Sequence, residues 1–103
     1  MTANELDELV RALSHASRRR ILRICSDGFV AAGDIASDID LALASVSEHL
    51  KVLRKTGLVE LDREGTRWLY CTNGDRVNQV LDALQSDLPT TDRTVRTAKG
   101  KRP

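Results

Sequence analysis

The sequence predicts a mainly α-helical domain with one small β-hairpin, an α+β fold, and two observations lead to this prediction. The first is an apolar stripe with the three- and four-residue steps of a helix face, formed by Leu43, Val46, Leu50 and Leu53. The second is the stretch 59–72, where two short segments typical of strands flank Glu64 and Gly65. A helix followed at once by such a hairpin is typical of a winged helix-turn-helix.

Two helices are predicted before position 28. The first covers about 3–14, because Thr2 to Glu5 has the form of a capping box and apolar residues follow at helical spacing. The second runs from Ser17, its expected N-cap, to about Ser26. Three arginines, 18–20, stand in its first turn, where the helix dipole disfavours cations. Phosphate contacts and a plain solvated face explain this run equally well.

The middle of the chain predicts the helix-turn-helix pair. A short extended segment, 29–31, precedes a third helix over 32–39. Asp40 is the expected N-cap of a fourth helix, about 41–55, which Gly57 ends because glycine takes a positive φ at low cost. The third and fourth helices, joined by a tight turn, form the pair. After the hairpin, a fifth helix is expected to open at Asp75 and to stop before Pro89.

The fourth helix carries a polar face opposite its apolar stripe. Hydroxyl and cationic side chains of this kind meet base edges and phosphates in a major groove. We therefore expect DNA contacts from this face and from the basic hairpin, at Ser45, Ser47, Glu48, Lys51, Arg54, Lys55, Arg63 and Arg67.

Charge is distributed unevenly along the chain. The formal net charge is +1, so bulk charge does not indicate a nucleic-acid binder. Residues 90–103 hold five basic residues and one acidic residue, which leaves 11 basic and 14 acidic residues in 1–89. Attraction to DNA must then come from local patches.

We expect one DNA-binding and dimerisation domain, 1–89, followed by a basic, disordered tail, 90–103.

The core of so short a chain is small, because only three aromatic residues are available to fill it. We therefore expect a partner subunit to cover the apolar stripe of the first helix, which consists of Leu6, Leu9, Val10 and Leu13. Packing of this stripe within its own domain is the alternative.

Three segments, RALSHASRRRIL, ASVSEHLKVLRKTGLVE and REGTRWLY, resemble the ArsR/SmtB family of small dimeric winged-helix repressors. The resemblance covers about residues 5–88. It implies that a homodimer forms through the first and last helices and binds operator DNA until an inducer weakens the binding. The last helix would add Val80, Leu81, Leu84 and Leu88 to the interface.

The resemblance also implies roles for residues near the DNA. Toward the bases it places Ser45, Ser47, Glu48 and His49, and at the wing tip Arg67 would reach the minor groove or its phosphates. Two features depart from the family pattern. Residues 42–44 are Ala, Leu and Ala where polar residues are usual, so this end reads bases weakly or contacts thymine methyl groups. Glu48 is acidic where cations or amides are common, so it must accept from a cytosine amine or pair with a basic neighbour.

Other residues occupy the family's metal-ligand positions. The thiolate site would fall at Ala31 and Gly33, and neither side chain can bind a metal. The site on the last helix would combine Asp75 with positions 77 and 88, which are Val and Leu. Soft and borderline metals need several nitrogen or sulfur donors together. We therefore expect no metal and no cofactor.

The two cysteines leave an alternative function open. Cys25 lies on the apolar side of the second helix, where a small core residue is the simpler interpretation, and Cys71 closes the second hairpin strand. Redox or reactive-sulfur sensing through Cys25, Cys71 or both is the alternative. A winged-helix module that binds proteins is another.

Some function classes are not expected. The sequence shows no nucleophile with its base and no glycine-rich phosphate loop, so an enzyme is not predicted. It shows no apolar run long enough to span a bilayer and no secretory signal pattern, which favours a cytoplasmic protein.

Overall fold

The computed structural model describes residues 1–91, which form five helices and three strands in the predicted order. The elements are α1 (Ala3–Leu13), α2 (Ala16–Ile24), β1 (Val30–Ala31), α3 (Ala32–Ile39), α4 (Leu43–Lys55), β2 (Val59–Glu64), β3 (Arg67–Thr72) and α5 (Gly74–Asp87). This order confirms the winged helix-turn-helix prediction. The expected tail, 90–103, lies outside the described residues from position 92 onward.

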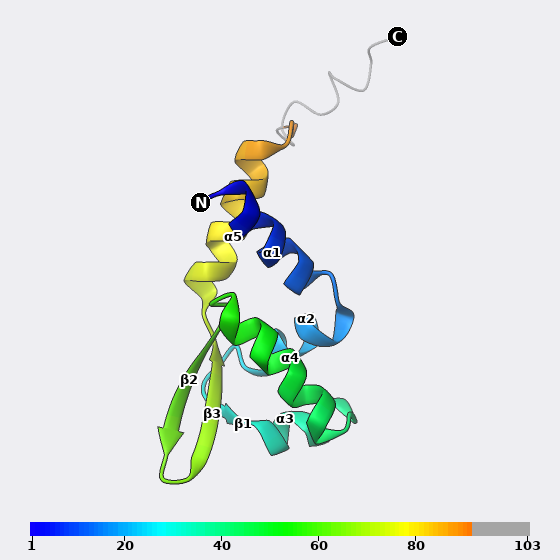
Figure 1. Cartoon of the computed structure of the whole chain (residues 1–103), viewed down its shortest axis with the longest axis vertical. Coiled ribbons are helices and arrows are strands. Elements are labelled where there is room, and N and C mark those ends of the chain that lie inside the picture. The colour runs from blue at the N-terminus through cyan, green and yellow to red at the C-terminus, as the bar shows by residue number, and fades with distance from the viewer. Residues whose placement is uncertain (92–103) are drawn as a thin grey trace.

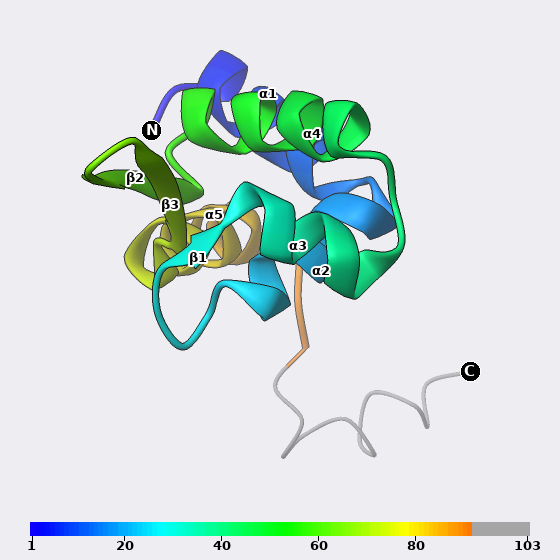
Figure 2. The same cartoon turned by 90° about the horizontal axis from the view of Figure 1, so that it is seen from below.

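The helices and the hairpin occupy different parts of the molecule (Figure 1). The β2–β3 hairpin projects at one end, and α1 packs beside α5 toward the other. Seen from below, α4 lies across α3 and α2, and the sheet closes one side (Figure 2). Within residues 1–91 no helix combines the length and the apolar character needed to cross a bilayer.

The helix ends agree with the sequence at α1 and depart from it at α2 and α4. The backbone N–H of Glu5 donates to Thr2 Oγ1 at 3.1 Å, which completes the predicted capping box. The N-cap of α2 is His15 and not Ser17, because the Arg19 N–H already bonds the His15 carbonyl at 3.1 Å. Asp40 caps the end of α3 and not the start of α4. Its φ of 57° lies in the left-handed region, which Asp tolerates and which stops a helix, so α4 begins after Ala42.

The sheet contains a pairing that the sequence did not predict. β2 and β3 form the expected antiparallel hairpin, in register from Val59↔Thr72 to Glu64↔Arg67, and Gly65 takes a φ of 64° in the turn. The extended segment expected at 29–31 becomes β1, which pairs with β3 through Val30↔Tyr70 and Ala31↔Leu69. The strand order is therefore β1-β3-β2. β1 ties the hairpin to the start of α3.

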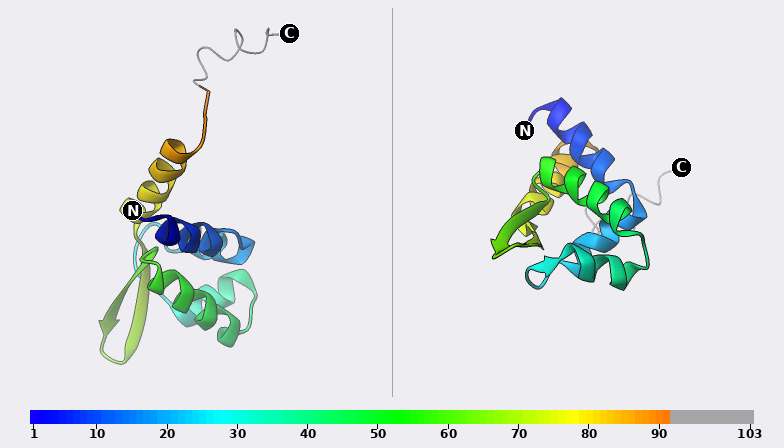
Figure 3. Two further views of the ribbon diagram at one scale, coloured as in Figure 1. Left: turned by 45° about the horizontal axis from the view of Figure 1, so that its top comes forward. Right: turned by 60° about the horizontal axis from the view of Figure 1, so that its bottom comes forward.

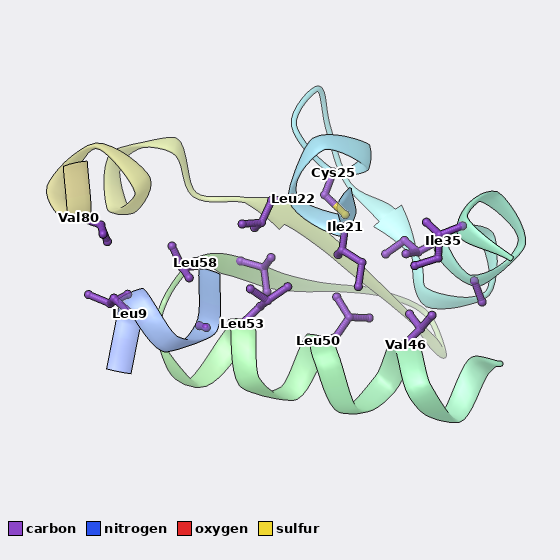
Figure 4. Packing of buried hydrophobic residues seen from close by; sticks show 14 residues of the cluster. Leu9, Ile21, Leu22, Cys25, Ile35, Val46, Leu50, Leu53, Leu58 and Val80 are labelled. Carbon is purple, nitrogen blue, oxygen red and sulfur yellow. The ribbon is translucent and has the colours of Figure 1, made fainter. Parts of the chain in front are cut away.

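The core lies between α4 and the elements that pack against it (Figure 4). On α4, Val46, Leu50 and Leu53 are at most 1% exposed, as the apolar stripe predicts. Burying side chains of this size contributes roughly 1.5–3 kcal/mol each. Leu43, predicted in the same stripe, is 53% exposed. That prediction was wrong. Leu43 is the first residue of α4, and the start of this helix extends past the core cluster.

Candidate nucleic-acid interface

The side of α4 that faces away from the core is polar and open. Its hydroxyl, acidic and cationic side chains are all exposed, namely Ser45, Ser47, Glu48, Lys51, Arg54 and Lys55. The buried stripe fixes the rotation of α4 about its own axis. The exposed face therefore follows from the same periodicity that builds the core. Within residues 1–91 no ion pair involves Glu48, so a basic neighbour does not offset its charge in the free protein.

His49 turns toward α2 and not toward the open face. It is half-buried, and Arg18 Nε donates to its Nδ1 at 3.3 Å. The ring of His15 lies beside it, with 6.3 Å between ring centroids. Burial lowers the pKa of His49, and the charges of Arg18 and His15 lower it further. The expectation that His49 faces the bases is therefore corrected. His49 lies on the side of α4 that packs against α2, and it accepts a hydrogen bond from Arg18.

The three arginines at the start of α2 have partners inside the chain. Arg18 bonds His49, as above. Arg19 Nη1 donates to the Leu13 carbonyl at the end of α1, at 2.7 Å. Arg20 Nη2 donates to the Asp38 carbonyl of α3, at 3.3 Å. These bonds to α1, α3 and α4 offset the unfavourable dipole position, so a structural role explains the run without phosphates.

The hairpin carries two exposed cations. Arg67 lies at the turn and forms a long ion pair with Asp34 of α3, with 3.8 Å between Nη2 and Oδ2. Both side chains are mostly exposed, so this pair is weak and Arg67 stays available to another anion. Arg63 stacks over the Trp68 ring, with 5.5 Å from the guanidinium carbon to the ring centroid. The hairpin and α4 diverge from the link at residues 56–58 (Figure 3, left).

Arg76 is a positioning residue that the sequence analysis missed. Its Nε donates to the Thr56 carbonyl, the C-cap of α4, at 3.0 Å. The same guanidinium pairs with Glu5 of α1, with 3.0 Å between Nη2 and Oε2. The partners of Arg76 lie 20 and 71 positions away in the sequence, and no local sequence pattern predicts contacts over such separations. Arg76 therefore connects the end of α4 to α1 and α5.

The residues predicted at a dimer interface divide into two groups. Leu9 and Val80 are at most 1% exposed, so they pack inside the single chain and leave no surface for a partner. For these two the interface prediction is corrected, because α1 and α5 cover each other there. The others keep apolar surface: Leu6, Leu13 and Leu84 are half-buried, and Val10, Leu81 and Leu88 are exposed.

The two cysteines differ in accessibility. Cys25 is fully buried, which confirms the interpretation as a core residue. Burial raises the pKa of its thiol to about 11, and the charge of Cys71 adds to this effect. Cys71 is half-buried, and its Sγ lies 3.7 Å from the Thr72 carbonyl oxygen. A reactive thiolate is therefore disfavoured at Cys25. In the part of the chain that the structure describes, no three His, Cys, Asp or Glu side chains gather where they could hold a metal ion.

Comparisons with known proteins agree with this geometry. A helix-turn-helix domain family matches residues 13–62. The transcriptional repressor SdpR of Bacillus subtilis is 30% identical over 83 residues, which span 77% of this chain and 92% of SdpR. An ArsR-like transcriptional regulator from Rhodococcus superposes with a TM-score of 0.74 and is 26% identical, covering 81% of this chain and 78% of that one.

A second solved structure concerns assembly. It is the homodimeric winged helix-turn-helix DNA-binding domain of Mb0332 from Mycobacterium bovis, a possible ArsR-family regulator. It is 30% identical with a TM-score of 0.69, and the match covers 82% of this chain and 80% of that one.

Proposed function

Because this chain belongs to the ArsR family of helix-turn-helix transcriptional regulators, we propose that it is a homodimeric repressor whose α4 reads the major groove of operator DNA. The β2–β3 hairpin contacts the backbone or the minor groove beside that site. Like its relatives, the chain is a DNA-binding regulator; it is not an enzyme. In this proposal it works without the family's metal ligands, whose positions hold Ala31, Gly33, Val77 and Leu88.

The observation that carries the proposal is the exposed face of α4. Lys51, Arg54 and Lys55 stand on its last two turns, and Ser45 and Ser47 on its first two. Cations bind phosphates and release counterions, whereas hydroxyl groups exchange hydrogen bonds with base edges. Residues 1–89 carry 11 basic and 14 acidic residues, so this local concentration of cations, and not the overall charge, attracts DNA.

The apolar surface on α1 and α5 supports the homodimer. Val10 on α1 and Leu81 on α5 are exposed although the two helices pack against each other. Mb0332 is described as homodimeric, and SdpR as a repressor. A two-fold dimer presents two α4 helices, which bind successive major grooves about 34 Å apart. The operator is then an imperfect palindrome.

A titration by fluorescence anisotropy tests the proposal. We expect a duplex from the promoter of its own gene to bind more tightly than a scrambled duplex, by a factor on the order of 10³ or more. The double variant Lys51→Gln/Arg54→Gln should reduce the magnitude of the salt slope by about four, because each of the two subunits loses two phosphate contacts. Arg23→Gln, on the exposed side of α2, is the matched control and should keep the slope.

Two results would contradict separate parts of the proposal. Equal affinity for promoter and scrambled duplexes would rule out operator recognition. A reporter gene driven by the same promoter tests repression. Deleting the gene that encodes this protein should raise expression of the reporter. A fall in expression would contradict repression and leave DNA binding intact.

A further inference from the structure

A cleft of about 370 Å³ separates α4 from the β2–β3 hairpin. One wall is the polar face of α4, with Ser47, Lys51, Arg54 and Lys55, and the buried Leu50 lies at its base. The other wall is aromatic and consists of Trp68 and Tyr70 from β3. The lining residues include three cations, all on α4, and no carboxylate, so the α4 wall of the cleft is electropositive.

The two aromatic side chains of the cleft are placed differently. Tyr70 is half-buried and packs against the core, whereas Trp68, two residues earlier on the same face of β3, is 45% exposed. Arg63 lies opposite Trp68 across the hairpin, and its guanidinium covers the indole. This cation–π contact favours that placement of the ring in the wall of the cleft. The exposed indole is therefore placed before any ligand arrives.

The shape of a duplex determines what must pass through this cleft. A major groove and the adjoining minor groove are separated by one sugar–phosphate backbone. A protein that inserts α4 into the first groove and reaches the second with a hairpin must straddle that backbone. We propose that the cleft holds this backbone segment and that Trp68 contacts it directly. This inference rests on the proposed function, and it adds a binding site and a residue to it.

The chemistry of the two walls suits a sugar–phosphate chain. Lys51, Arg54 and Lys55 supply positive charge to phosphate oxygens. Trp68 offers an apolar ring to the deoxyribose and a single N–H donor to a phosphate oxygen. Neither contact reads a base, so Trp68 strengthens binding to any duplex sequence.

Intrinsic fluorescence tests this proposal in the unmodified protein, because Trp68 is the only tryptophan of the chain. The full chain is titrated with the promoter duplex while tryptophan emission and the anisotropy of a DNA label are recorded together. We expect both signals to change with the same midpoint. We also expect acrylamide, a neutral quencher, to quench Trp68 less in the complex than in the free protein.

Two variants measure how much the contact contributes. Trp68→Ala should weaken binding to the promoter and scrambled duplexes by the same factor, roughly five- to tenfold. Phe29→Ala is the matched control, because Phe29 is 46% exposed but lies before β1, outside the cleft. It should leave both affinities unchanged. Thermal unfolding of each variant verifies that it is folded.

The outcomes separate this inference from the function on which it rests. If anisotropy reports binding while emission and quenching of Trp68 stay unchanged, the backbone does not occupy the cleft and the inference fails alone. If Trp68→Ala weakens binding to the promoter only, the residue reads bases and the backbone contact is wrong. If no duplex binds at all, the proposed function fails and takes this inference with it.

Discussion

Arg76 connects the end of α4 to two other helices, α1 and α5. Its guanidinium donates to Thr56 at the end of α4, to Glu5 on α1 and to Gln79 one turn along α5. Gly57 lies against it: a side-chain carbon there would meet Arg76 Nε at 3.4 Å, and the φ of 79° already favours glycine. These residues fix where α4 ends relative to α1 and α5.

The Glu5–Arg76 contact makes part of the stability depend on pH. Its hydrogen bond to Arg76 holds the pKa of Glu5 below the usual 4.5. A carboxyl group whose pKa is lower in the folded state stabilises the fold at pH values above its pKa in the unfolded state. That contribution is lost as the pH falls through the pKa of the folded state. Glu5→Gln should therefore lower the free energy of unfolding at pH 7, and the difference from wild type should shrink below about pH 4.5. Denaturant unfolding at several pH values measures this.

A double-mutant comparison provides the control for that prediction. In an Arg76→Met background, the pH-dependent effect of Glu5→Gln should become smaller, because the group that depresses the pKa of Glu5 most is gone and only the Thr2 N–H and the N-terminal charge remain. An undiminished effect in that background would show that Arg76 is not the main cause of the lowered pKa of Glu5.

The cysteines give a second prediction for single residues. With a pKa raised to about 11, the Cys25 thiol is almost entirely protonated at pH 8, and its sulfur is buried. A brief treatment of the native protein with iodoacetamide should label Cys71 and spare Cys25, whereas both should react in denaturant. Peptide mass spectrometry reads the result. Native labelling of Cys25 as fast as Cys71 would restore the hypothesis of a Cys25 sensor.

For the elements, sequence patterns predicted what depends on local periodicity. The span of α3 and the capping box of α1 agree with the prediction, and the buried stripe of α4 agrees apart from Leu43. The errors concern choices that neighbouring segments decide. Asp40 has the chemistry of an N-cap and also tolerates the left-handed region, and only the turn between α3 and α4 selects the second use. The pairing of β1 with β3 joins residues 38 and 40 positions apart, which no local pattern predicts.

The start of α4 offers a prediction at this scale. Ala42 occupies the N-cap position with extended backbone, φ −60° and ψ 142°, and alanine has no oxygen to accept from the first helical N–H groups. Ala42→Ser should stabilise the protein by about 1 kcal/mol. Thr2→Ala should destabilise it by a similar amount, because it removes the cap that α1 already has. A neutral or destabilising Ala42→Ser, measured by denaturant unfolding, would contradict this.

At the scale of the whole molecule, the uncovered apolar side chains on α1 and α5 predict the oligomeric state. Leu81 on α5 is 53% exposed, Leu88 just after this helix is 54% exposed, and Val10 on α1 is 39% exposed. Leu81→Lys should convert a dimer into a monomer, because a charge in an apolar interface cannot be solvated. Leu43→Lys is the matched control, with the same exposed fraction on α4, and should stay dimeric. Sedimentation equilibrium that finds both variants dimeric would place the interface elsewhere.

The candidate site was predictable from sequence only where exposure follows from helix periodicity. Lys51 and Arg54 are exposed because the buried stripe faces the other way. His49 shares that helix and still turns to Arg18, a contact between residues 31 positions apart. The same limit applies to Trp68, because only the folded chain brings β3 opposite α4.

Dimethyl sulfate footprinting on the promoter of its own gene tests the central claim most directly, because this reagent methylates guanine N7 in the major groove and adenine N3 in the minor groove. If α4 enters the major groove from each subunit, guanine N7 atoms should be protected in two clusters about 10 base pairs apart. Lys51→Gln/Arg54→Gln should lose this protection at the same protein concentration, and Arg23→Gln should keep it. Bound protein that leaves every guanine N7 reactive, or protects adenine N3 alone, would contradict the claim that the exposed face of α4 reads DNA.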